Sequence, residues 1–97
     1  MNLVFKALAD PTRRQVLALL RQGPMSAGAL ADNFPYSKPT MSAHFAVLRE
    51  AGLVEAEKQG SNVIYTLQLS VLEDALLAFT DTLGIGLPTA EPRPARK

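Results

Sequence analysis

The first half of the chain repeats apolar residues at the spacing of α-helices, with apolar positions three or four residues apart. Four such segments lie at residues 3–8, 11–22, 27–34 and 38–51. The last three each follow a residue whose side chain can cap a helix, namely Asp10, Ser26 and Ser37. The pattern therefore predicts four helices.

The second half changes to the period of strands. Residues 53–57 and 62–67 are typical of strands, and the turn-forming residues 59–61 lie between them, which predicts a hairpin. A last helical stripe covers residues 71–83, with Ser70 in the position of its cap.

The predicted order is four helices, a β-hairpin and a fifth helix (ααααββα). The helices at 27–34 and 38–51, joined by a short turn, form a helix-turn-helix, and the hairpin makes a wing. We expect a mainly α fold with a β-hairpin wing (α+β), a winged helix-turn-helix at residues 1–84. The tail, residues 85–97, has three prolines and predicts a flexible basic arm.

The helix predicted at 38–51 has the features needed to read the major groove of DNA. Met41, Phe45 and Leu48 form its buried stripe, which leaves the opposite face free. Such a face needs short polar side chains and some positive charge. The candidate DNA-binding residues here are Ser37, Lys38, Pro39, Thr40, Ser42, Ala43 and His44. An ordinary amphipathic helix with a solvated face fits the same pattern.

His44 is the only histidine of the chain. Its position beside Phe45 favours a packing or hydrogen-bonding role, with a phosphate contact as the alternative. One histidine without thiols makes a poor metal site. At the hairpin tip, Lys58 and Ser61 are further DNA-binding candidates, although a solvated hairpin fits them equally well.

Three arginines lie in or beside the second predicted helix. Arg13 is near the apolar stripe and is a candidate structural ion-pair partner. Arg14 and Arg21 are expected to be more exposed, where they serve solvation or meet phosphates.

Charge is unevenly distributed along the chain. Residues 1–49 hold six Lys/Arg and two Asp/Glu, whereas residues 50–84 hold one Lys and six Asp/Glu. A basic first half suits contacts with phosphates, and the acidic second half does not.

The absence of cysteine narrows the classes of function. It removes disulfides, thiolate metal sites and thiol nucleophiles. No nucleophile–base pair, glycine-rich phosphate loop or metal motif is found, so we do not expect an enzyme. The first residues do not read as a signal peptide and no apolar run reaches about 20 residues, so a cytoplasmic protein is expected.

Three motifs resemble the ArsR-type winged-helix repressors. Residues 5–14 (FKALADPTRR) resemble the opening signature of the family, residues 37–45 (SKPTMSAHF) its recognition helix, and residues 48–54 (LREAGLV) its exit into the wing. The match covers roughly residues 3–83. The resemblance implies a dimeric repressor that binds double-stranded DNA. The wings of the family often carry an arginine where this chain has Ser61, so we expect little affinity from the wing.

The resemblance also implies that the first and last helices form the dimer interface. Both segments carry wide apolar stripes, and a domain this small has little core for them to cover. Covering the core of a monomer is the alternative. The candidate interface residues are Leu3, Val4, Phe5, Leu8, Leu72, Leu76, Phe79 and Leu83. Two recognition helices would then meet successive major grooves about 34 Å apart, on an inverted repeat.

The chain departs from relatives that sense metals through paired thiols, or through histidines and carboxylates on the last helix. It has no cysteine, and its last helix offers only Glu73, Asp74 and Asp81. We therefore expect no metal and no other cofactor. The chain is more similar to the metal-free branch, which includes autorepressors of the sporulation-delaying-protein immunity type. In that branch a membrane protein or another partner can relieve repression.

The sequence thus predicts a sequence-specific repressor that acts without metal, with autorepression as one form. Two alternatives stay open. A small organic ligand between the apolar end helices could control the repressor, or the domain could be a protein-interaction module that does not bind DNA. The acidic second half favours the latter.

Overall fold

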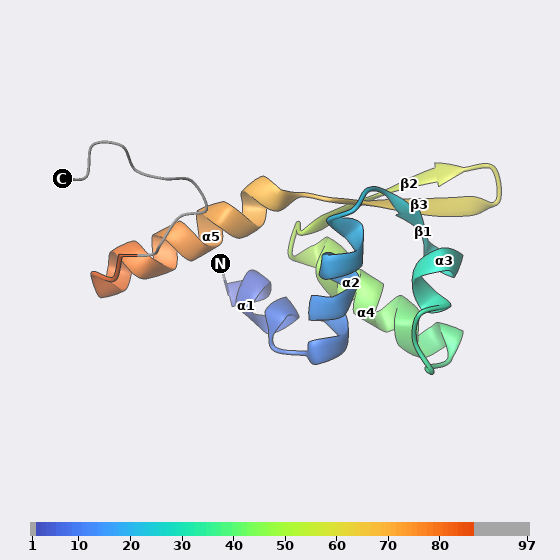
Figure 1. Ribbon diagram of the computed structural model, residues 1–97, viewed down its shortest axis with the longest axis horizontal. Coiled ribbons are helices and arrows are strands. Elements are labelled where there is room, and N and C mark those ends of the chain that lie inside the picture. Colours follow the sequence, from blue (N-terminus) through green and yellow to red (C-terminus); the bar gives the residue numbers. More distant parts are fainter. Residues whose placement is uncertain (1, 87–97) are drawn as a thin grey trace.

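The computed structural model describes residues 2–86 and has the expected mainly helical winged helix-turn-helix architecture (Figure 1). Its elements are α1 (Asn2–Leu8), α2 (Pro11–Leu20), β1 (Met25–Ser26), α3 (Ala27–Ala31), α4 (Lys38–Glu50), β2 (Val54–Gln59), β3 (Asn62–Leu67) and α5 (Leu69–Leu83). The order ααααββα is confirmed, with β1 as an addition. Most of the expected tail lies outside the described residues.

The wing is part of a three-stranded antiparallel sheet with the order β1-β3-β2. Pairing of β2 with β3 runs from Val54 opposite Leu67 to Gln59 opposite Asn62, so the hairpin turn is shorter than the sequence predicts. Strand β1 pairs Met25 with Tyr65. It has only two residues, which is too short for any alternation to reveal it.

Side-chain caps fix the starts of three helices, as the sequence predicts. Asp10 accepts a hydrogen bond from the Arg13 N–H at 3.0 Å, and Ser26 accepts one from Ala29 at 3.0 Å. Each bond satisfies an N–H that has no partner within its helix. Ser37 caps α4 in the same way.

The predicted cap at Ser70 is wrong. Helix α5 begins at Leu69 with Gln68 in the cap position, and no side chain accepts a bond there. The backbone of Gln68 is held instead, because its N–H donates to the Leu53 carbonyl at 2.8 Å and its carbonyl accepts from Val71 at 3.1 Å. The strand therefore leads into the helix through backbone hydrogen bonds.

The hydrophobic core lies where α2, α3 and α4 meet the sheet. Its largest fully buried side chains are Leu30, Met41, Leu48, Leu53 and Val16. The rings of Phe45 and Tyr65 pack at 5.0 Å between centroids, which joins α4 to the central strand. Burial raises the pKa of Tyr65 above its ordinary value of 10.0.

Helix α5 extends away from this core, at the opposite end of the molecule from the wing tip (Figure 1). Only Ala75 and Thr80 are buried along its 15 residues. Phe79 packs on Phe5 of α1, with ring centroids 5.1 Å apart. Among residues 2–86, no helix combines the length and apolar composition needed to cross a membrane.

Candidate nucleic-acid interface

Helix α4 has one buried side and one exposed side, as predicted. Met41, Phe45 and Leu48 are at most 4% exposed. The exposed positions of the helix and its cap include six of the seven DNA-binding candidates predicted there, and the seventh, His44, is half-buried. The exposed candidates are Ser37, Lys38, Pro39, Thr40, Ser42 and Ala43, and Ala46 is exposed beside them, while Arg49 and Glu50 are exposed at the far end of the helix. The first half of this surface combines one cation, three hydroxyl groups and small side chains that let another molecule approach the helix closely.

The first turn of α4 is organised by two hydroxyl groups. The Ser37 Oγ accepts a hydrogen bond from the Thr40 N–H at 3.3 Å and donates one to the Thr40 Oγ1 at 3.0 Å. The Thr40 hydroxyl therefore keeps its own proton for an outside acceptor. Because both residues are exposed, this proton can reach a phosphate or a base edge.

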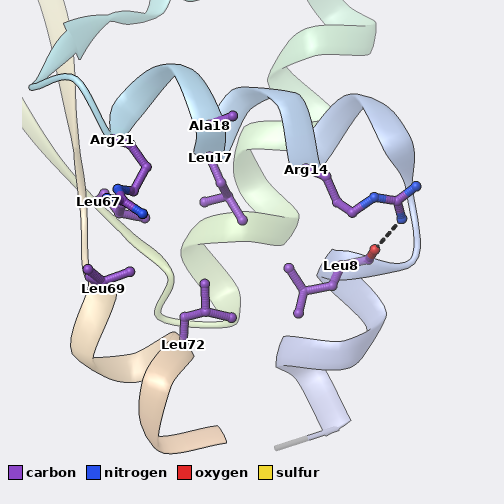
Figure 2. A pocket seen from close by; sticks show the side chains of 8 residues that line it. All are labelled: Leu8, Arg14, Leu17, Ala18, Arg21, Leu67, Leu69 and Leu72. Atoms are coloured by element: carbon purple, nitrogen blue, oxygen red, sulfur yellow. Dashed lines mark hydrogen bonds between the residues drawn. The ribbon is translucent and has the colours of Figure 1, made fainter. Parts of the chain in front are cut away.

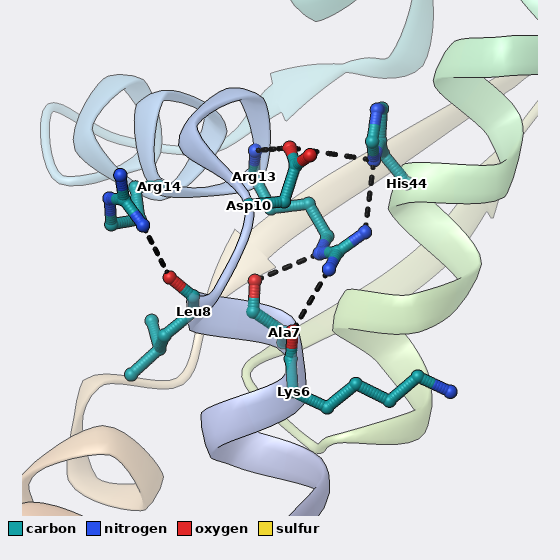
Figure 3. Close-up of polar contacts among 7 residues, drawn as sticks. All are labelled: Lys6, Ala7, Leu8, Asp10, Arg13, Arg14 and His44. Carbon is teal, nitrogen blue, oxygen red and sulfur yellow. Dashed lines mark hydrogen bonds and ion pairs between the residues drawn. The ribbon is translucent and has the colours of Figure 1, made fainter.

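His44 sits on the flank of α4 and connects it to α2 (Figure 3). Its Nδ1 lies 3.2 Å from the Arg13 Nη1 and 3.9 Å from the Asp10 carboxylate. The predicted hydrogen-bonding role of His44 is confirmed. Its Nδ1 takes part in the contact between helices, so His44 positions α4 against α2.

Arg13 and Arg14 hold the end of α1. Arg13 donates from Nε to the Ala7 carbonyl at 2.8 Å and from Nη2 to the Lys6 carbonyl at 2.9 Å. Arg14 donates to the Leu8 carbonyl at 2.6 Å. The Lys6 carbonyl also accepts from the Ala9 N–H at 3.2 Å, and the last carbonyls of a helix lack donors of their own, so the two arginine side chains act as a C-terminal cap. Arg13 is a structural residue as predicted, but its side chain bonds two carbonyls and a histidine and forms no ion pair among residues 2–86.

The Asp10 carboxylate stays ionised in this network. The hydrogen bond from the Arg13 N–H lowers the pKa of Asp10 below its ordinary value of 3.8, and the nearby His44 and Arg13 act in the same direction. The Asp10 cap and the His44 contact therefore share one charged group, which links the start of α2 to α4.

The wing presents little positive charge. Lys58 and Ser61 are exposed near its tip, but Glu55 and Glu57 are exposed on the same strand as Lys58. Figure 1 shows the wing tip and the start of α4 toward the same end of the molecule. Any DNA that meets both would find most of its cationic contact on α4.

The candidate dimer residues differ in exposure. Leu3, Phe79 and Leu83 are 43%, 43% and 55% exposed. Phe5, Leu8, Leu72 and Leu76 are half-buried, and Val4 lies in the core of its own chain. Val4 thus supports this surface from beneath. Leu77, which the sequence does not single out, is also exposed, at 59%. It lies about 120° around α5 from Leu83 and is therefore outside the candidate dimer surface.

No group of three or more His, Cys, Asp or Glu side chains that could hold a metal ion occurs within residues 2–86. Glu73, Asp74 and Asp81 of α5 are all exposed.

Comparison with known proteins assigns this architecture to a family. Residues 8–57 match the model of a helix-turn-helix domain. The transcriptional repressor SdpR of Bacillus subtilis (strain 168) is 43% identical over 76 residues, which cover 78% of this chain and 84% of SdpR. The crystal structure of an ArsR family transcriptional regulator superposes with a TM-score of 0.75 at 34% identity, covering 84% of this chain and 87% of that one. The chain belongs to the ArsR family.

Other ArsR-family relatives agree with this assignment. The arsenical resistance operon repressor of Staphylococcus xylosus is 34% identical over 73 residues, which cover 75% of this chain and 70% of the relative. The protein is therefore a DNA-binding transcriptional repressor of the ArsR family and not an enzyme.

Proposed function

We propose that this ArsR-family repressor controls its own gene by binding an inverted-repeat operator as a homodimer, and that it does so without a metal ion. The observation that carries the proposal is the division of α4, whose Met41, Phe45 and Leu48 are buried while its opposite side is exposed and polar. A helix seated in this way can enter the major groove without disturbing the core.

Each exposed residue has a role suited to its chemistry. Lys38 neutralises a phosphate, and Ser37 with the start of α4 offers hydrogen bonds to another. Thr40 and Ser42 contact phosphates or base edges, while Pro39 and Ala43 allow close approach. His44 holds the helix in place through α2. Lys58 and Ser61 add minor contacts from the wing.

The second protomer is proposed to cover the apolar residues that α1 and α5 leave exposed. Leu3, Phe79 and Leu83 lie on these two helices, and Phe79 packs on Phe5 beneath. A two-fold axis would bring the same surface from both protomers together. It would also place two α4 helices about 34 Å apart, one helical turn of DNA.

Metal independence is supported by the residues that the chain offers. The whole sequence has no cysteine and one histidine, and that histidine is engaged by Arg13. The carboxylates of α5 alone would make a weak site for hard ions. Release from DNA would then depend on another molecule, such as a sequestering protein, including a membrane protein, or a small ligand.

The proposal is tested by fluorescence anisotropy with the DNA upstream of the protein's own coding sequence and a scrambled duplex of the same composition. We expect tight binding to the upstream DNA only, unchanged by a chelator, because autorepression and metal independence both require it. Affinity should fall steeply with salt. Equal binding to both duplexes, or loss of binding with chelator, would contradict the proposal.

A further inference from the structure

A small cleft opens between α1, α2, β3 and α5, on the side of α2 that faces α5 (Figure 2). Its volume is about 240 Å³. The residues that line it are Leu8, Arg14, Leu17, Ala18, Arg21, Leu67, Leu69 and Leu72. Five of the eight are leucines, and they come from all four surrounding elements.

The walls of the cleft are apolar and its rim is cationic. Leu17 is buried at the back, while Leu8, Leu67 and Leu72 are half-buried around it. None of the lining residues is acidic. The cleft therefore combines a surface that attracts apolar groups with positive charge that no lining carboxylate neutralises.

Both cations lie along one face of α2, Arg14 within the helix and Arg21 at its C-cap. Arg14 and Arg21 are seven residues apart, which places them two turns apart on the same side of the helix, with Ala18 between them. Arg14 is anchored by its hydrogen bond to the Leu8 carbonyl. Within residues 2–86, the Arg21 guanidinium makes no hydrogen bond or ion pair, so its donors are available to a ligand.

We propose that this cleft binds a small monocarboxylate with a compact apolar body. The body would pack among Leu17, Leu67 and Leu72, and the carboxylate would pair with Arg21. The volume of the cleft limits the ligand to a small molecule. It exceeds the roughly 150 Å³ of an apolar cavity that holds benzene, and it lies below the range of about 300–1,000 Å³ for larger ligands.

The position of the cleft gives such a ligand a route to control DNA binding. Leu8 and Leu72 belong to the candidate dimer surface, and α2 holds α4 through Arg13 and His44. A ligand bound between α2 and α5 would shift α1 and α5, which carry the candidate dimer surface, relative to α4. This regulatory consequence rests on the proposed function, whereas binding of the ligand does not.

The test uses the full chain labelled with ¹⁵N, titrated with benzoate and, in parallel, with benzamide, which has a similar shape without the charge. We expect saturable changes in the amide signals of residues around the cleft, such as Ala18 and Leu67. Benzamide should bind about tenfold more weakly or worse, because it loses the charged pair.

Two variants locate the site. Arg21→Gln should weaken benzoate about tenfold and leave benzamide unchanged. Ala18→Leu fills the cleft from an exposed helix position and should abolish binding of both. Arg49→Gln removes an exposed arginine outside the cleft and should leave benzoate binding as it was. The amide spectrum of each variant reports whether it folds.

Benzoate that fails to bind at millimolar concentrations, binds elsewhere, or binds Arg21→Gln as tightly as the unaltered chain would overturn the proposal. Anisotropy on the upstream DNA is measured separately on the same samples. Binding of benzoate without binding of DNA would support this site and contradict the proposed function. Binding of DNA without binding of benzoate would contradict only the site.

Discussion

Helices α4 and α5 are both amphipathic, yet only α4 finds cover for its apolar side within one chain. Met41, Phe45 and Leu48 of α4 are at most 4% exposed. In α5 the corresponding stripe contains Leu72 and Leu76, which are half-buried, and Phe79 and Leu83, which are 43% and 55% exposed. An apolar stripe of this kind needs a surface to pack against.

The difference shows how one pattern serves two purposes. The apolar side of α4 builds the core and turns its polar side outward, where it can meet DNA. The apolar side of α5 continues past the core, and its exposed residues are the surface that we propose a second copy covers. Full burial of a side chain such as leucine is worth about 1.5–3 kcal/mol. Four predictions test this comparison, beginning with the largest expected effect.

Replacing one leucine in each helix by alanine should lower the free energy of unfolding by different amounts. Leu48→Ala should lower the free energy of unfolding by about 2–5 kcal/mol at any protein concentration, because it leaves a cavity in a closed core. Leu83→Ala should cost less, and its cost should grow with protein concentration, because its partner is another chain. Urea denaturation at two protein concentrations checks both, and equal, concentration-independent losses would refute the comparison.

A charge on the apolar stripe of α5 should weaken the dimer without unfolding the chain. Leu83→Glu should weaken dimerisation about tenfold or more, equivalent to about 1.4 kcal/mol, because burying a carboxylate without a partner is costly. Leu77→Glu is the matched control, since Leu77 is 59% exposed, close to the 55% of Leu83, but lies outside the stripe. Sedimentation equilibrium measures both. The proposed interface fails if Leu77→Glu is the more disruptive change.

A change on the polar side of α4 should affect DNA binding alone. Lys38→Ala should weaken binding to every duplex and reduce the slope of log affinity against log salt concentration by about 0.9, since one phosphate contact is lost. Lys6→Ala, at an exposed position on α1, should leave the slope unchanged. Anisotropy titrations over a salt series measure the slopes, and an unaltered slope for Lys38→Ala would remove it from the interface.

The smallest effect concerns the charged group that links α2 to α4. Folding lowers the pKa of Asp10 below 3.8, so its stabilising effect is complete above that value and is lost as the pH falls through the lower folded pKa. Asp10→Asn keeps a good cap but does not titrate. It should therefore lose less stability between about pH 6 and about pH 3 than the unaltered chain. Thermal unfolding of both proteins at both pH values measures this difference. Identical losses of stability in the two proteins would show that ionised Asp10 does not stabilise the fold.

The sequence predicts well what is decided locally. Helical periods and the caps at Asp10, Ser26 and Ser37 depend on neighbours a few residues away, so the starts of α2, α3 and α4 and the buried side of α4 could be predicted, although α3 ends at Ala31 and not at Phe34. Strand β1 could not be predicted in this way, because two residues are too few to show an alternation of apolar and polar positions. Ser70 fits a cap by its local sequence, but the start of α5 is set by the backbone hydrogen bonds of Gln68 with Leu53 and Val71.

The features that depend on distant contacts were harder to predict. Arg13 and Arg14 cap α1 only because the chain folds back beside it, which no local pattern in residues 2–8 indicates. The contact of His44 with Arg13 joins residues 31 positions apart. The cleft between α2 and α5 arises from four elements together, and no single segment indicates it.

The most direct test of the central claim is the number of chains on one duplex of upstream DNA, measured by native mass spectrometry. We predict two chains of 10.5 kDa per duplex, falling toward one or none for Leu83→Glu. A single chain bound specifically and tightly, with Leu83→Glu binding equally well, would contradict it. The exposed side of α5 would then have no part in repression.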